Sequence, residues 1–179
     1  MTPSDEAEAA MTSQSTTYRA RPWMDSDNAW ERWLRPDEPR VSPDRNAQLM
    51  KLRKGQMEHR LDVLRMRDRA PRLALYGRTI NGQPPVRSLA AGRELAERMG
   101  WQVPHGQTFT DCLSVTACED RHGWARVKES VKQGFTDGVV ALTRATISPD
   151  LDDYGAELDW FDLHSSFLVL VHAENVVTA

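Results

Sequence analysis

The chain has 179 residues, of which 40% are hydrophobic and 27% are charged, and its formal net charge is −3 at pH 7. One domain of ordinary size accounts for most of this length and leaves a shorter segment over. The sequence has no apolar run of about 18 residues, so we expect no membrane-spanning helix. An acidic N-terminus without an apolar stretch and only two cysteines favour a protein of the reducing cytoplasm, without a disulfide framework.

The charges are unevenly distributed along the chain. The segment 44–72 contains nine basic and four acidic residues, whereas 145–179 contains seven acidic residues and no lysine or arginine. We expect these segments to attract each other, either within one chain or between two copies, and the second case would give a dimer or higher oligomer. The acidic segment is a poor surface for DNA, because DNA binding depends on the neutralisation of phosphates.

The first part of the chain, residues 1–41, is expected to be a tail that contains one short helix. Residues 1–21 are rich in serine, threonine, alanine and acidic residues and show no apolar period, which is typical of disorder. Further on, Trp30 and Trp33 fall on one face of a short predicted helix. That face either packs on the chain's own domain, or Trp23, Trp30 and Trp33 bind a protein partner, because aromatic anchors dominate many interfaces.

Residues 42–71 are predicted to form a long, basic, amphipathic helix. The sequence Ser42-Pro43-Asp44 is typical of a helix start, and Pro71 stops the run. The apolar positions that recur along it are Met50, Met57, Leu61 and Leu64. The helix either docks this stripe on the domain or on a second copy, or it binds nucleic-acid backbone through its basic faces.

From residue 73 onward, short apolar strands alternate with helical segments. The expected strands are Leu73–Thr79, Trp101–Val103 with Thr108 and Phe109, Val139–Leu142 and Phe167–Val171. The expected helices are one that Ser88 caps and Gly100 ends, one from Asp120 to Gln133, and one that Ser148 caps and that runs to Leu163. This series predicts a three-layer α/β fold over residues 72–179, with a mostly parallel sheet of four to five strands and right-handed crossovers.

The first of these strands, Leu73–Thr79, is the one around which the fold is organised. Apolar residues fill its first half, and Arg78 lies near its end. Open α/β folds bind their ligands at the carboxyl edge of the sheet, where the strands end. We therefore expect the Arg78 guanidinium at an edge suited to ligand binding.

This strand also begins a series of motifs that resemble those of a known family. Leu75-Tyr76-Gly77-Arg78-Thr79-Ile80 resembles hydrophobic-Tyr-x-Arg-Val-Ser, the opening motif of the resolvase/invertase family of serine recombinases. The further matching segments are Ser88-Leu89, Gly100-Trp101, Phe109-Thr110-Asp111 with Ser114, Arg121-His122-Gly123-Trp124, Gly134 to Val140, and Leu142-Thr143-Arg144. Their order and spacing are similar to the family's, which implies a resolvase-like α/β domain in which Tyr76, Ser88 and Ser114 are motif positions.

The resemblance also implies a chemistry for the carboxyl edge. In the family, a serine hydroxyl attacks a DNA phosphodiester and becomes linked to the 5′ phosphate, and arginines neutralise the charge of the transition state. Arg78, Arg121 and Arg144 match three of those arginines and form the candidate anion-binding or phosphate-binding site. The serine is replaced by Ile80 and the family's aspartate by Thr143, and a further arginine has no counterpart, so no catalytic set is intact.

Three functions stay open from these residues. The first is a catalytically inactive resolvase-like protein that serves as a DNA-associated regulatory or protein-interaction module, with DNA contacts through the basic segment 44–72. The second is an active strand-exchange recombinase with a displaced nucleophile such as Thr79, Thr146 or Ser148. The third is a scaffold protein that recruits a partner through the Trp-rich segment.

No metal or cofactor is expected. The five histidines are scattered along the chain, and Cys112 and Cys118 are too far apart for the usual spacing of zinc ligands. The acidic residues between Asp150 and Asp159 are interpreted as favourable charges at a helix N-terminus and on a solvated face, rather than as a cation site.

Overall fold

The computed structural model describes residues 44–79, 82–115 and 120–174, which belong to one compact unit within Pro43–Ala179. The predicted disordered tail, the Trp-rich helix with Trp23, Trp30 and Trp33, and position Ile80 lie outside the described residues. Among the described helices, none is long and apolar enough to cross a membrane.

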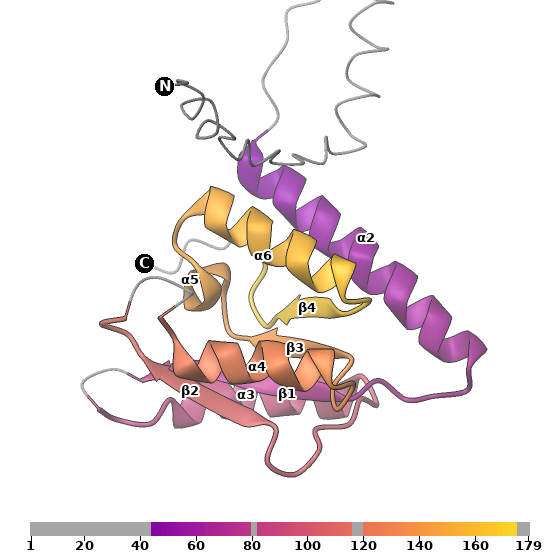
Figure 1. Cartoon of the computed structure of the whole chain (residues 1–179), viewed down its shortest axis with the longest axis horizontal. Helices are drawn as coiled ribbons and strands as arrows, with labels where there is room; N and C mark the ends of the chain where they lie inside the picture. Colours follow the sequence, from indigo (N-terminus) through magenta and orange to yellow (C-terminus); the bar gives the residue numbers. More distant parts are fainter. Residues whose placement is uncertain (1–43, 80–81, 116–119, 175–179) are drawn as a thin grey trace, which may run out of the picture. The chain divides into compact units, whose positions relative to one another are not determined.

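A parallel sheet of four strands forms the centre of this unit (Figure 1). In the order in which they lie side by side, the strands are β2 (Thr108–Cys112), β1 (Leu73–Thr79), β3 (Gly138–Ala141) and β4 (Phe167–Leu170). All the pairings are parallel, so the strands end at one common edge, the carboxyl edge. The predicted α/β fold with a mostly parallel sheet is confirmed.

Helices cover both faces of the sheet, as the three-layer prediction requires. In the described part of the chain they are α2 (Arg45–Met66), α3 (Val86–Arg98), α4 (His122–Lys132), α5 (Arg144–Ile147) and α6 (Leu151–Leu163). The apolar core on one face is formed with α4, α5 and α6, and the core on the other face is formed with α3.

Strand β1 is buried on both faces because its side chains alternate between the two cores. Ala74 and Tyr76 belong to the core beneath α4 and α6, whereas Leu73 and Leu75 belong to the core beneath α3. None of these four side chains is more than 1% exposed. Burial of each large apolar side chain contributes roughly 2 kcal/mol, which explains why the predicted bounds of this strand are confirmed.

Helix α2 docks on its own domain, which is one of the arrangements expected for it. It packs against α6 and against β4, an edge strand of the sheet. Leu49, in its N-terminal half, joins one apolar core, and Leu61 and Leu64, in its C-terminal half, join the other. The helix therefore spans the β4 edge from one face to the other, and this cover hinders the pairing of β4 with a further strand.

Three predicted helix starts are wrong. Asp44, and not Ser42, is the N-cap of α2, and this helix covers Arg45–Met66 rather than 42–71. Ser88 lies inside α3, which begins at Val86 directly after Pro85. The cap of α6 is Asp150 rather than Ser148, because the Asp150 carboxylate accepts from the backbone N–H groups of the two residues that open the helix, Asp152 and Asp153.

Two other boundaries also differ from the prediction. The second strand is Thr108–Cys112 rather than Trp101–Val103, and Gln102 makes only an isolated bridge with Arg72. The short helix α5 was not predicted, because four residues are too few to show a helical period.

Candidate functional site at the carboxyl edge of the sheet

Tyr76 and Asp111 join the ends of β1 and β2 to the start of α4. The Tyr76 hydroxyl donates to Asp111 Oδ2 at 2.9 Å, and the Asp111 carboxylate also accepts from the backbone N–H groups of Gly123 at 2.7 Å and Trp124 at 2.8 Å. Burial and, after it, the Asp111 charge raise the pKa of Tyr76. Asp111 thus satisfies the orphan amides of the helix start, as an N-cap does, from a neighbouring strand.

Gly123 is required by the close approach of α4 to β2. A Cβ atom at this position would lie 2.7 Å from the Thr110 carbonyl oxygen and 2.8 Å from Asp111 Oδ2. The Tyr76 ring also packs on the Trp124 ring, with centroids 4.8 Å apart. The motif positions Tyr76, Asp111 and Gly123 therefore form one structural unit that sets the geometry of the carboxyl edge.

Arg78 and Arg121 converge on the turn that follows β2. Arg78 Nη2 donates to the carbonyl oxygens of Leu113 and Val115, each at 2.6 Å. Arg121, only 1% exposed, donates from Nε to the same Val115 oxygen at 3.1 Å and from Nη1 to the carbonyl of Ile147. The two guanidiniums therefore share one acceptor and tie the turn to the end of α5.

Arg144 donates to the two backbone carbonyls that follow the Ile147 carbonyl, to which Arg121 donates. Its Nη1 donates to the carbonyl oxygens of Ser148 at 3.1 Å and Pro149 at 2.6 Å, which follow Ile147 directly. The structure thus brings all three candidate arginines to one part of the carboxyl edge. Each of the three donates to at least one backbone carbonyl of this edge.

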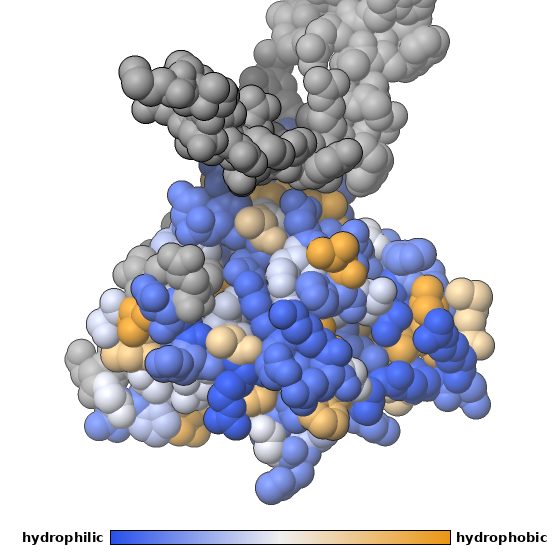
Figure 2. Space-filling model, in the orientation of Figure 1, coloured by the Kyte–Doolittle hydropathy of each residue, from blue (hydrophilic) through white to orange (hydrophobic). Residues whose placement is uncertain are grey.

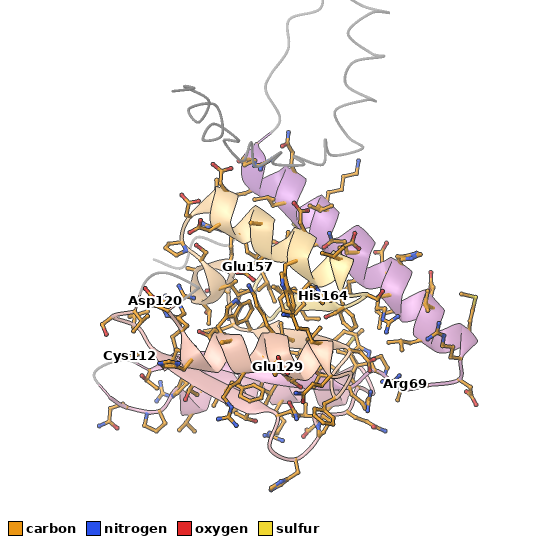
Figure 3. All side chains as sticks on the ribbon, in the orientation of Figure 1. Arg69, Cys112, Asp120, Glu129, Glu157 and His164 are labelled. Carbon is orange, nitrogen blue, oxygen red and sulfur yellow. The ribbon has the colours of Figure 1, made fainter. Side chains whose placement is uncertain are left out.

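Cys112 and Ser114 lie in the turn that Arg78 holds. The Ser114 hydroxyl donates to Cys112 Sγ at 3.0 Å, and this hydrogen bond is the largest of the effects that lower the pKa of the exposed Cys112 thiol. Figure 3 shows Cys112 at the end of the sheet opposite Arg69. Sequence reasoning treated Cys112 only as a poor metal ligand, because nothing in the sequence shows a hydrogen bond formed across a turn.

Comparisons with known proteins identify the fold. The N-terminal catalytic domain of TP901-1 integrase matches with a TM-score of 0.50 and 22% sequence identity, covering 56% of this chain and 76% of that one. The C-terminal catalytic domain of ISC1926 TnpA, an IS607-like serine recombinase, matches with a TM-score of 0.51 and 16% identity, covering 59% and 71%. The fold is that of a serine recombinase catalytic domain. No protein-family model and no curated protein matches the sequence.

The motif residues of the carboxyl edge lie on or next to β1, β2 and α4 of this recombinase fold. Tyr76 and Arg78 lie on β1, Asp111 lies on β2, Ser114 follows β2, and Arg121 precedes α4. Among the described residues, no group of three or more histidine, cysteine or acidic side chains is arranged to hold a metal ion.

Basic residues of helix α2 form ion pairs that hold the helix on its own domain. Arg53 and Glu174, both buried, form a bidentate pair with N–O distances of 2.6 and 3.1 Å, and the Tyr154 hydroxyl donates to Glu174 Oε1 at 3.0 Å. Arg45 lies 3.6 Å from Asp152 of α6. The expected attraction between basic and acidic segments therefore operates within one chain.

Proposed function

We propose that this chain is a recombinase-fold protein that does not cleave DNA and acts as a DNA-associated regulatory or protein-interaction module. The observation that carries the proposal is that Arg78, Arg121 and Arg144 all donate to backbone carbonyls of their own chain. A phosphate group at this edge would compete with these carbonyls for Arg78 Nη2, for Nε and Nη1 of Arg121, and for Arg144 Nη1. The arginines thus stabilise turns instead of standing ready for the transition state of phosphoryl transfer.

Thr143 supports the same proposal. It stands where the resemblance implies an aspartate, and it begins α5 with its hydroxyl 3.2 Å from the Thr146 hydroxyl and its backbone N–H donating to Thr146 Oγ1 at 3.4 Å. A threonine in this arrangement neither carries a negative charge nor acts as a strong base. With Ile80 at the nucleophile position, two residue types that the chemistry needs are replaced in the sequence.

The hydroxyl groups that the structure describes give little support to the alternative of an active recombinase with a displaced nucleophile. Ser148 is 1% exposed and its Oγ accepts from the backbone N–H of Asp150, so the hydroxyl is sequestered from a DNA substrate. Thr146 is engaged with Thr143, and Thr79 Oγ1 donates to the Asp111 carbonyl at 3.3 Å. The Ser148 hydroxyl also donates to Asp153 Oδ2, at a long 3.4 Å, but its burial keeps this pair away from a DNA substrate.

The test is whether the full chain forms a covalent bond with DNA. The protein is incubated with nicked duplex substrates that trap covalent intermediates, and the products are separated under denaturing conditions beside an active serine recombinase as positive control. We expect no protein–DNA adduct. A phosphoserine or phosphothreonine link to DNA would contradict the proposal.

A matched variant tests whether the missing nucleophile alone, or also the engagement of the arginines, prevents DNA cleavage. Ile80→Ser returns a hydroxyl to the family's nucleophile position and leaves the arginines in place. Because their donors are held by carbonyls, we expect Ile80→Ser to form no adduct either. An adduct formed by this variant alone would show that the arginines can still bind phosphate and that only the hydroxyl is lacking.

A further inference from the structure

Arginine is concentrated at the amino edge of the sheet, where the strands begin. The face in Figure 2 is mostly hydrophilic, with hydrophobic residues scattered over it, as is ordinary for globular domains. Arg60 and Arg69 reach the amino edge from the C-terminal part of α2 and the turn after it, and Arg72 precedes β1. Arg69 is seen there in Figure 3, at the end of the sheet away from Cys112.

Asp137, which precedes β3 and is 4% exposed, is the centre of this arginine cluster. Both of its oxygens accept from Arg69 Nη2, at 2.8 and 2.9 Å, and Oδ2 also accepts from the backbone N–H of Arg72 at 2.9 Å. These bonds tie the turn after α2 and the entry into β1 to the carboxylate. One arginine side chain and one backbone amide are enough for that structural task.

Two further guanidiniums approach Asp137 without bonding to it. Arg60 Nη2 lies 3.7 Å from Oδ1 and Arg72 Nε lies 3.6 Å from Oδ2, which are ion-pair distances but too long for hydrogen bonds. The Nε–H groups of both residues are buried and have no hydrogen-bond partner within the described residues. These buried Nε–H groups carry a free-energy cost, and the exposed parts of the same two guanidiniums are what an anion from solvent would meet.

The cluster also carries excess positive charge. Arg60, Arg69 and Arg72 share the single carboxylate of Asp137, and the exposed Arg67 of the turn after α2 adds a further positive charge near Arg60. Burial lowers the pKa of Arg60, Asp137 opposes this effect, and the guanidiniums of Arg67 and Arg69 lower that pKa further. An additional anion would relieve this crowding.

A second ion pair that docks α2, between Arg53 and Glu174, is an example of a purely structural contact in this protein. Arg53 meets Glu174 one to one, with two hydrogen bonds, and a tyrosine hydroxyl completes the site. Arg53 and Glu174 are 5% and 0% exposed, so the pair is closed to solvent. In the arginine cluster, by contrast, the side chains of Arg60, Arg69 and Arg72 are 18%, 38% and 31% exposed.

We propose that the arginine cluster binds a phosphate group on the solvent side of Asp137. Guanidinium forks match the tetrahedral arrangement and charge of phosphate oxygens, and Arg is the residue best suited to such contacts. The phosphate is either free or part of a DNA backbone, and the second source rests on the proposed function. This site is separate from the arginines at the carboxyl edge, which lie at the opposite ends of the strands.

The test measures phosphate binding by the full chain. Thermal unfolding is followed while inorganic phosphate is added, with sodium chloride and sodium acetate at matched ionic strength as references. We expect phosphate to raise Tm well beyond either reference, because it binds only the folded state. Equal shifts in phosphate and chloride, or in phosphate and acetate, would overturn the proposal.

Variants locate the site without removing the partner of Asp137. The double variant Arg60→Gln/Arg67→Gln keeps Arg69 and Arg72, and we expect it to bind phosphate about tenfold more weakly, a loss of about 1.4 kcal/mol. Arg65→Gln is the matched control, since Arg65 is 74% exposed on the same helix and pairs with Asp62. If the double variant does not fold, Arg67→Gln alone replaces it. Unchanged affinity in the folded variant contradicts the site.

A labelled DNA duplex distinguishes the two sources of phosphate. If the site takes a backbone phosphate, the duplex binds in a salt-dependent way, inorganic phosphate competes with it, and the double variant loses the binding. If the site takes a free phosphate, inorganic phosphate binds and the duplex does not compete. Failure of all phosphate binding overturns the site but leaves the covalent-adduct test unaffected, so the two proposals fail separately.

Discussion

The two edges of the sheet both gather arginines, but they use them differently. At the carboxyl edge, Arg78 and Arg121 donate to the carbonyls of a turn, and Arg144 holds the carbonyls that follow α5. At the amino edge, Arg60 and the rest of the arginine cluster surround the single buried carboxylate of Asp137. At the carboxyl edge, the guanidiniums donate to several different backbone carbonyls. At the amino edge, several guanidiniums surround one carboxylate.

The contrast shows that the residue type alone does not define an anion site. A guanidinium has five donors in a fixed fork, and these donors serve backbone turns as well as phosphates. The arginines that match the family's motifs are engaged in holding the fold together. Those outside the motifs, in the arginine cluster, gather around one shared carboxylate and are partly exposed, so we infer the anion site there.

The largest effect is expected from Asp137→Ala, which removes the centre of the arginine cluster. The substitution leaves Arg69 and the Arg72 amide without their acceptor and places several cations together. Loss of one partner of a buried pair leaves a buried charge uncompensated, and we expect a loss of about 3 kcal/mol in unfolding free energy. Urea denaturation measures it, with Asp62→Ala as the control for an exposed pair. Similar small losses in both variants would show that the cluster does not support the fold.

A smaller effect is expected from Arg121→Met at the carboxyl edge. Methionine keeps most of the side-chain volume but removes the donors to Val115 and Ile147, inside a site that is 1% exposed. Because hydrogen bonds to charged groups contribute about 1.5–3 kcal/mol, we expect a loss of about 2 kcal/mol, measured by urea denaturation. A variant as stable as the original chain would mean that this arginine is not structural and would weaken the proposed loss of catalysis.

The smallest effect concerns the reactivity of Cys112. Because the Ser114 hydroxyl is the main cause of the lowered pKa of this thiol, Ser114→Ala should raise that pKa and reduce the thiolate fraction near neutral pH. We expect alkylation of Cys112 by iodoacetamide to slow by a factor of about 3 near pH 7 and to be equal for both proteins at high pH. Peptide mass spectrometry follows the rate at this cysteine, and an unchanged rate near neutral pH contradicts the role of Ser114.

The sequence predicts an element correctly where the pattern of neighbouring residues is enough to define it. Leu73–Thr79 was predicted with its correct bounds because every side chain in its first half is apolar and both faces of β1 are buried. Ser88 failed as a cap because the backbone after Pro85 already enters the helix, so a good capping residue one turn later has no orphan amide left to satisfy. Ser148 failed because Asp150 is closer to the amides that need an acceptor.

The sequence by itself determined the alternation of strands and helices, the mostly parallel sheet and the likeness to serine recombinases. These follow from periodicity and from motifs, which are properties of neighbouring residues, whereas Leu49 rather than the predicted Met50 docks the N-terminal half of α2. Only the tertiary structure decided what each arginine does, since Arg69 meets a carboxylate 68 residues away, Arg53 one 121 residues away, and Arg78 a carbonyl 37 residues away. A charge count in one segment cannot show which partner the fold brings to it, and that pairing separates the structural arginines from the proposed anion site.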